Sequence, residues 1–97
     1  MSILLPLHPG RVLEIEFLEP LNLKAYTLSK KLGVPRSSIE SVVRGRRPIS
    51  AALALRLSRF FGNSLAFWTN LQSHYELEVA KDEIGDDINS IEPYTQA

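Results

Sequence analysis

The 97-residue sequence contains no cysteine, and this absence excludes two kinds of structure. Disulfide bonds and thiolate metal sites cannot form, and a chain without cysteine suits a reducing compartment, so we expect a cytoplasmic protein. No apolar run reaches the roughly 18 residues that a membrane-spanning helix needs, so we expect no membrane partner. The N-terminal stretch lacks the basic start and the cleavage site that are typical of a signal peptide.

Groups that carry catalysis are also scarce. Only two histidines occur, and we expect His8 to cap the helix that begins at Pro9 and His74 to lie on a helix surface. The sequence has no glycine-rich phosphate loop, no nucleophile elbow and no HExxH zinc motif. Acidic residues cluster near the C-terminus, but without the spacing of a calcium loop, so we interpret them as solvated side chains. The sequence therefore predicts no enzyme activity, no metal site and no cofactor.

Net charge is also absent, since 11 basic residues balance 11 acidic ones, but the charge is unevenly distributed. Residues 20–61 hold nine Lys and Arg against one acid, Glu40, which gives +8. Residues 1–19 carry −2 and residues 62–97 carry −6. A basic centre between acidic ends indicates two partners of opposite charge. The alternative is that surface charges on helices cluster by chance.

The basic centre contains a stretch, residues 23–47, with the pattern of two short helices joined by a tight turn. Gly33 can end the first helix, because glycine adopts positive φ without steric cost. Pro35 cannot continue that helix but fits at the start of the next one, residues 36–44. Ile39 and Val42 lie on one side of this second helix and are expected to face the core.

The other side of helix 36–44 carries Arg, Ser and Glu, because five polar residues recur there at helical spacing. A helix with one apolar face and one such polar face suits insertion into the DNA major groove, and basic residues follow it where phosphates would lie. The alternative is a helical hairpin with an ordinary solvated face. The predicted DNA-binding residues are Lys24, Arg36, Ser37, Ser38, Glu40, Ser41, Arg44, Arg46 and Arg47.

The remaining sequence completes an all-α fold of five helices. The other four are predicted from Pro9 to about Pro20, over 24–32, over 51–61 with Ser50 as N-cap, and over 65–81 with Asn63 or Ser64 as N-cap. We therefore divide the chain into a lead-in, 1–8, a helical domain, 9–81, and a loose acidic tail, 82–97. The expected core stripe of helix 51–61 is Ala54, Leu55, Leu57, Ser58 and Phe61.

Helix 65–81 carries more apolar residues than five compact helices can easily bury. A symmetric dimer is one way to cover them, although a wide core face is the alternative for the residues of helix 51–61. The residues predicted for a dimer interface are Leu53, Phe60, Phe67, Trp68, Leu71 and Tyr75.

Taken together, several segments resemble the HigA-type antitoxins of bacterial toxin–antitoxin modules, which belong to the lambda-repressor-like helix-turn-helix group. The resemblance covers about residues 8–85 and is carried by HPG at 8–10, FLEP at 17–20, LGVPRSSI at 32–39, GRRPIS at 45–50, RLSRFFG at 56–62 and FWTNLQSHYELEVA at 67–80. The sequence departs from the family at the start of the second helix, where Lys24 and Ala25 replace the usual Ser or Thr and Gln. It also departs at Ala66, where an acid is usual, and at Thr69, where Leu is common.

This resemblance implies a dimeric protein of five helices that binds operator DNA, represses its own operon and binds a HigB-like toxin that cleaves messenger RNA. A stand-alone repressor and an interaction domain without DNA binding are the alternatives, and the arginines of the basic centre argue against the second. Because such a toxin is expected to be basic, we predict that it docks on the acidic, apolar N-terminal region, with the acidic tail as a weaker second site. Residues 1–8 could instead cover the domain's own core. The predicted toxin-binding residues are Ile3, Leu4, Leu5, Leu7, Val12 and Glu16.

Overall fold

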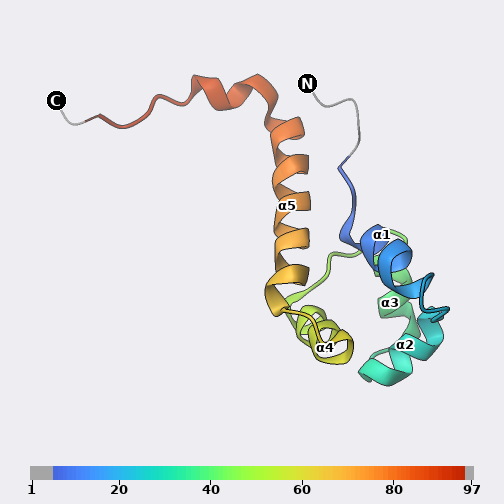
Figure 1. The fold of residues 1–97 in the computed structure, drawn as a ribbon. Helices are drawn as coiled ribbons and strands as arrows, with labels where there is room; N and C mark the ends of the chain where they lie inside the picture. The colour runs from blue at the N-terminus through green and yellow to red at the C-terminus, as the bar shows by residue number, and fades with distance from the viewer. Residues whose placement is uncertain (1–5, 96–97) are drawn as a thin grey trace.

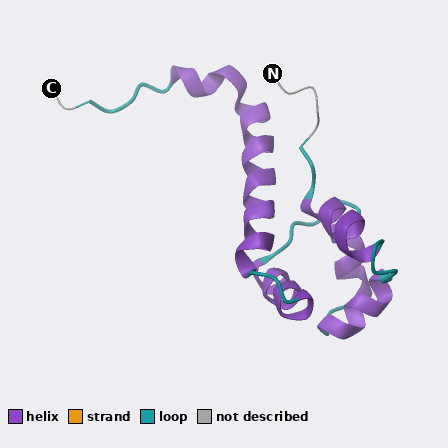
Figure 2. Ribbon diagram, viewed as in Figure 1, coloured by secondary structure: helices purple, strands orange, loops and turns teal. Residues whose placement is uncertain are grey.

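The structure is a computed structural model that describes residues 6–95, and these residues form an all-α fold (Figures 1 and 2). Five α-helices occur in the order predicted from the sequence. They are α1 (Pro9–Leu13), α2 (Ala25–Leu32), α3 (Arg36–Val43), α4 (Ala51–Phe61) and α5 (Leu65–Ile84). The π-helix η1 (Glu14–Leu18) continues α1 directly, and the 3₁₀-helix η2 (Gly85–Ser90) follows α5.

Local capping residues explain most helix boundaries. The side chains of Ser50 and Ser64 each accept a hydrogen bond from a backbone N–H in the first turn of α4 and α5, both at 3.1 Å. Gly33 and Gly62 end α2 and α4 with φ values of 70° and 72°, a left-handed conformation that favours glycine. His8 caps α1, as predicted, because its Nδ1 accepts a hydrogen bond from the backbone N–H of Gly10 at 2.9 Å.

The core lies where α1 to α4 meet the first half of α5. Trp68 is completely buried at its centre, and its indole Nε1 donates to Oδ1 of Asn63 at 2.9 Å, so its polar atom is satisfied. Phe17 of η1 packs against the Trp68 ring at a centroid distance of 4.9 Å. The buried apolar residues are Leu13, Leu18, Leu28, Leu32, Ile39, Val42, Ile49, Leu53, Ala54, Leu57 and Trp68.

Helix α1 approaches α3 more closely than any side chain would allow. A Cβ atom on Gly10 would lie 1.8 Å from the carbonyl oxygen of Val42 and 2.6 Å from its carbonyl carbon. Glycine at position 10 therefore lets the backbone of α1 rest against the C-terminal end of α3. The HPG segment thus has a physical explanation, in which His8 caps the helix, Pro9 occupies its first position and Gly10 makes the contact.

Three details differ from the sequence predictions. In α4 the buried stripe runs through Leu53, Ala54 and Leu57, whereas Leu55 is 56% exposed, so the prediction that Leu55 is a core residue was wrong. The stripe keeps Ala54 and Leu57 but is turned towards Leu53 by less than the 100° of one residue, a difference that apolar periodicity alone cannot resolve when Leu and Ala alternate. The first helix is α-helical only to Leu13 before it widens to η1, and α5 continues to Ile84, three residues into the predicted tail.

Candidate nucleic-acid interface

The turn between α2 and α3 sets the position of α3. Gly33 reverses the chain, and the backbone N–H of Val34 donates to the carbonyl of Ser29 at 3.0 Å. Pro35 then starts α3 with extended backbone angles, φ −61° and ψ 146°. Ile39 and Val42 fill the core side of α3, with 0% and 2% exposure, as predicted. The opposite side of α3 is consequently the one that faces solvent.

Most of the polar residues predicted on α3 lie on this outer side. Arg36, Ser37 and Arg44 are exposed, while Glu40 and Ser41 are half-buried. Ser38 is also half-buried but points elsewhere, because it lines a shallow pocket between α3 and α4 together with Val34, Arg47 and Arg56. Arg36 and Arg44 are eight residues apart, so about two helical turns separate the two cations.

Arg36 is held from two sides. Its Nε–H donates to Oε2 of Glu40, one turn later, at 2.8 Å. Its guanidinium also lies 5.9 Å from the ring centroid of Tyr26 on α2, and Lys30 lies 5.1 Å from the same centroid. Sequence reasoning missed Tyr26 and Lys30, because their closeness to Arg36 depends on how α2 packs against α3.

The basic loop after α3 is fixed by backbone hydrogen bonds. The N–H groups of Arg46 and Arg47 both donate to the carbonyl of Ser41, at 2.8 and 3.3 Å, so both arginines lie close to the end of α3. Gly45 turns the chain with φ 75°, and its N–H donates to the carbonyl of Val42. Both arginine side chains are exposed, so this loop presents two cations beside α3.

Gln72 of α5 holds the other end of this loop. It is buried, and its Oε1 accepts the backbone N–H of Ile49 at 2.7 Å, while its Nε2 donates to Glu76 at 2.9 Å. A buried backbone N–H without a partner would be costly, so this bond stabilises the path of residues 45–50. Sequence reasoning missed Gln72, since a polar residue on a largely apolar helix face gives no signal of its partner.

His8 packs against the same loop from the side of α1. Its ring lies 4.8 Å from the Tyr75 ring, edge to face, and a Cβ on Gly45 would come within 3.6 Å of it. Burial lowers the pKa of His8 below its usual value of 6.5, and a hydrogen bond with the backbone of Arg47 partly offsets that shift. The imidazole therefore favours its neutral form in the folded protein.

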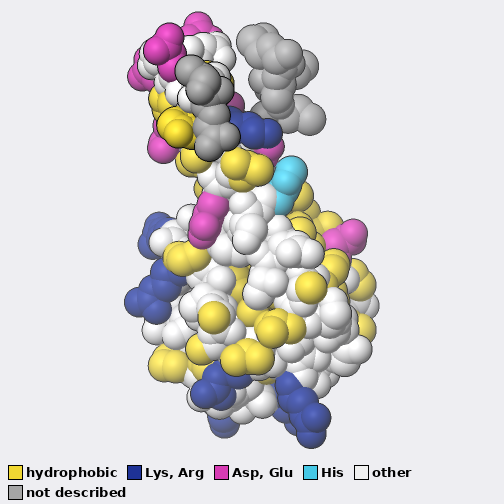
Figure 3. All heavy atoms as spheres, turned by 90° about the vertical axis from the view of Figure 1, so that its left-hand side faces the viewer, with side chains coloured by type: hydrophobic (Ala, Val, Ile, Leu, Met, Phe, Trp, Pro, Cys, Tyr) yellow, Lys and Arg dark blue, Asp and Glu magenta, His cyan; other side chains and the backbone are white. Residues whose placement is uncertain are grey.

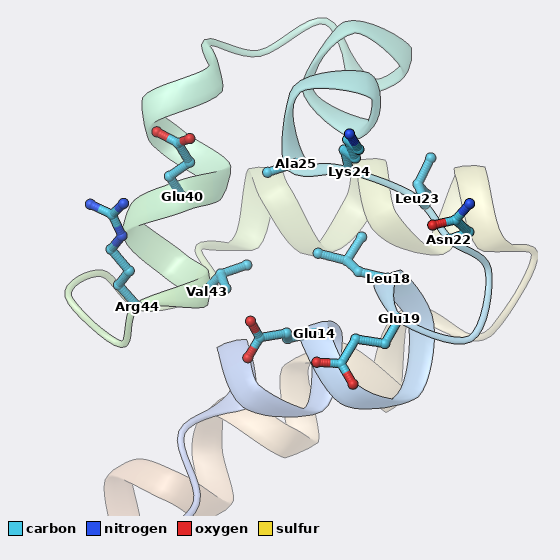
Figure 4. Close-up of a pocket in the computed structure, with 10 residues that line it drawn as sticks. All are labelled: Glu14, Leu18, Glu19, Asn22, Leu23, Lys24, Ala25, Glu40, Val43 and Arg44. Carbon is cyan, nitrogen blue, oxygen red and sulfur yellow. The ribbon is translucent and has the colours of Figure 1, made fainter.

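A groove of about 510 Å³ separates α3 from the start of α2 (Figure 4). Lys24 precedes α2 and makes no side-chain cap, as expected from the missing Ser or Thr. Its side chain is exposed. Glu40 and Arg44 line the α3 wall, and Glu14 and Glu19 line the opposite wall. The three glutamates and the two cations, Lys24 and Arg44, make the charge of the groove mixed rather than uniformly basic.

The residues predicted for protein partners fall into two groups. Leu53 and Trp68 are buried in the core of the same chain, so the prediction that they reach a second subunit was wrong for these two. The others retain exposed surface: Phe60 and Phe67 are exposed, and Leu71 and Tyr75 are half-buried.

In the N-terminal region Leu7 and Glu16 are exposed and Val12 is half-buried. Ile3, Leu4 and Leu5 lie outside the described residues. Figure 3 shows acidic side chains gathered over the end of α5 and the segment after it, while most visible Lys and Arg side chains lie on the helical body.

Residues 6–95 contain no group of three or more His, Cys, Asp or Glu side chains that could hold a metal ion. None of the helices in this part of the chain is both long enough and apolar enough to cross a membrane.

Comparison with known proteins places this interface in a family. Residues 15–68 match the helix-turn-helix family, whose members are DNA-binding regulators rather than enzymes. Virulence-associated protein I of Dichelobacter nodosus is 43% identical over 77 residues, which cover 79% of this chain and 71% of that protein.

Two solved structures extend the match over nearly the whole chain. The Pseudomonas aeruginosa antitoxin HigA, solved with the higBA promoter, is 41% identical, and the match has a TM-score of 0.88 and covers 93% of this chain and 99% of that one. A HigA-family antidote protein of an addiction module from Coxiella burnetii is 36% identical, with a TM-score of 0.88 and coverage of 94% and 100%. This chain therefore belongs to the HigA-type antitoxins, a family of helix-turn-helix proteins.

Proposed function

We propose that this protein is an antitoxin that binds operator DNA through α3, represses its own operon and binds a HigB-like toxin that cleaves messenger RNA. The observation that carries the DNA-binding part is the arrangement of four arginines around one helix. Arg36 and Arg44 project from the outer side of α3, while Arg46 and Arg47 are fixed beside its end by backbone bonds to Ser41. The structure of a 41% identical relative, solved with its promoter, supports the same role.

In this proposal α3 enters the major groove. Arg36 and Arg44 contact base edges, where arginine can form a bidentate contact with guanine. Ser37, Glu40 and Ser41 adjust base choice, while Lys24, Arg46 and Arg47 contact phosphates. Ser38 takes a secondary part, because it faces α4 rather than the outer side of α3.

Two substitutions test this assignment by different readouts. Arg36→Ala should cost about 1–3 kcal/mol of binding free energy on the preferred sequence and relax specificity. Arg47→Ala should weaken binding to every sequence and reduce the salt dependence by about one unit of slope. Fluorescence anisotropy on preferred and random duplexes at several salt concentrations measures both. If Arg36→Ala binds both duplexes as the wild type does, α3 is not the helix that enters the groove.

A dimer is part of the proposal, because a single α3 reads only a few base pairs. Two copies related by a two-fold axis would place their α3 helices about 34–36 Å apart on one face of the duplex. Support comes from the second half of α5, which extends beyond the helical body (Figure 1). There Leu77 is 53% exposed and Ile84 is 44% exposed, and both line a shallow apolar groove with Ala80 and Ile88. A second copy that covers these side chains would bury apolar surface that the single chain leaves exposed. Phe67, Leu71 and Tyr75, also proposed for the dimer contact, lie on another side of α5, since each residue turns the helix by 100°.

The toxin is proposed to dock on the N-terminal segment and α1. Leu7 is 60% exposed, and Val12 and Glu16 retain accessible surface on an acidic part of the chain. A toxin that binds messenger RNA is expected to be basic, and opposite charges speed association. Deleting residues 1–7 and measuring the affinity for the toxin and for DNA decides the point. Loss of toxin binding with retained DNA binding is expected, whereas full toxin affinity would refute this docking site.

A further inference from the structure

Arg36 is positioned before any DNA arrives. Its side chain lies between a carboxylate on its own helix, Glu40, and an aromatic ring on the preceding helix, Tyr26. The Arg36 Nε to Glu40 Oε2 distance is 2.8 Å, and the guanidinium lies 5.9 Å from the Tyr26 centroid, within the roughly 6 Å range of cation–π attraction. A long exposed arginine would otherwise sample many rotamers.

The atoms used in these contacts decide which ones remain for DNA. A guanidinium has five N–H donors, and Glu40 takes the one on Nε. The four donors on Nη1 and Nη2 are left at the outer end of the side chain, and these two nitrogens are a pair suited to the O6 and N7 acceptors of guanine. Both side chains of the ion pair keep solvent exposure, 62% for Arg36 and 32% for Glu40, so the pair does not bury the arginine.

Tyr26 has no evident part in the core. It is 50% exposed, although it belongs to a helix whose buried positions are Leu28, Ser29 and Leu32. Its ring instead makes cation–π contacts with two residues of the basic surface, Lys30 and Arg36. The tyrosine therefore links α2 to the first residue of α3.

We propose that Tyr26 and Glu40 are positioning residues that hold Arg36 in the orientation for reading guanine. The proposal rests on the DNA-binding function proposed above. The role it assigns to Glu40 has two alternatives. Glu40 could itself accept a hydrogen bond from cytosine, or it could simply repel phosphates. Only the positioning role makes its effect depend on Arg36.

The probe is a duplex that the wild-type protein selects from a randomised pool, compared with a scrambled duplex of equal length and composition. Each guanine of the selected duplex is replaced in turn by 7-deazaguanine, which lacks the N7 acceptor. The guanine at which the wild type loses affinity and Arg36→Ala does not is the one that Arg36 reads. Affinities for both duplexes are measured by fluorescence anisotropy at fixed salt.

The expected readout is the ratio of the two affinities. Tyr26→Leu should lower this ratio about two- to fivefold, the effect of an exposed cation–π contact, and Tyr26→Phe should preserve it because the ring remains. Glu40→Ala should lower the ratio by a similar factor while it strengthens binding to the scrambled duplex, since a negative charge near phosphates is removed. In the Arg36→Ala background neither substitution should change the ratio.

Matched controls lie far from α3. Tyr94→Leu removes a tyrosine that is 88% exposed in the segment after η2, and Glu92→Ala removes an exposed carboxylate there. Both should leave the ratio unchanged, and circular dichroism checks that every variant keeps its helix content.

The possible failures are distinguishable. A pool that enriches no sequence refutes the proposed DNA-binding function, and the positioning role with it. An enriched sequence for which Glu40→Ala still alters the ratio in the Arg36→Ala background shows that Glu40 reads a base directly. If Glu40→Ala increases the affinity for both duplexes by the same factor, Glu40 only repels phosphates. Either of these results, or an unchanged ratio in Tyr26→Leu, overturns the positioning role.

Discussion

Replacing Gly10 with alanine is the sharpest test of the packing described above, because two effects of opposite sign meet at this position. Gly10 lies inside α1, where alanine would normally stabilise the helix by about 0.5–1 kcal/mol. Its φ is not in the left-handed region, so the backbone itself accepts a side chain. Local propensity alone therefore predicts a more stable protein.

Packing predicts the opposite result. The new Cβ would lie 1.8 Å from the Val42 carbonyl oxygen, and real Cβ atoms essentially never come within 3.0 Å of such an atom, so α1 and α3 must separate by at least about 1.2 Å. No rotamer change can relieve a contact between a Cβ and a backbone carbonyl. Overpacking of this kind costs about 1–3 kcal/mol or more, and we expect a net loss of about 2 kcal/mol after the helix gain. In a chain of this size that corresponds to a fall in Tm of about 8–16 °C.

Thermal and urea unfolding followed by circular dichroism measure this loss. Gly62→Ala is the control, because nothing lies within 4 Å of its added Cβ and only its φ of +72° opposes the change, at a cost of about 1–2 kcal/mol. DNA affinity should fall in Gly10→Ala, since the contact displaces the end of α3, and should hold in Gly62→Ala. An unfolding free energy of Gly10→Ala at or above that of the wild type would refute the close approach of α1 to α3.

Three further predictions concern the loop, the capping histidine and the second half of α5. Gln72→Ala leaves the buried N–H of Ile49 without its acceptor, so urea unfolding should show a loss of about 1–3 kcal/mol, with weaker DNA binding because Arg46 and Arg47 lie in the loosened loop. Burial lowers the pKa of His8, so the unfolded chain binds a proton at His8 more readily than the folded protein does. The contribution of His8 to the free energy of unfolding should therefore be complete above about pH 6.5 and should fall as the pH drops from there towards the folded pKa. His8→Asn should reduce this pH dependence, as measured by urea titrations at pH 5 and pH 7.5. The double substitution Leu77→Asp and Ile84→Asp should convert a dimer to a monomer in analytical ultracentrifugation. Helix content should change little, because both side chains are exposed in the single chain. An unchanged sedimentation coefficient would contradict a dimer contact there.

Helix order and several helix ends were predictable because their causes are local. Gly33, Ser50 and Gly62 act within one turn of their own positions, so the sequence alone indicates where α2 ends and where α4 begins and ends. The outer face of α3 was predictable for a similar reason, since a period of 3.6 residues places Ser37 and Arg44 opposite the buried pair Ile39 and Val42. The family resemblance then extended these local inferences to about residues 8–85, and the match to HigA antitoxins confirms the resemblance.

Contacts between distant segments were not predictable from these patterns. The Gly10 approach to Val42 joins α1 to α3, the Tyr26 contact joins α2 to α3, and the Gln72 bond joins α5 to the loop before α4. In each case the decisive partner is a backbone atom or a side chain that no spacing rule connects to the first residue. The rotation of α4 has a different cause, because Leu53 and Leu55 are equally apolar and only the surroundings decide which one is buried.

Helix α5 packs into the core at one end and extends from the helical body at the other. Trp68 and Gln72 fix its first half to the core and to the loop beside α3, while Leu77 and Ile84 lie beyond that attachment on the same continuous helix. In a dimer joined through this second half, the distance between the two DNA-reading helices would be set by the helical phase between residues 72 and 77. One inserted residue there would advance the distal face by 1.5 Å and turn it by about 100°. The spacing of operator half-sites would then be inherited from the length of this one helix, and a lineage could change its operator without altering any residue that touches DNA.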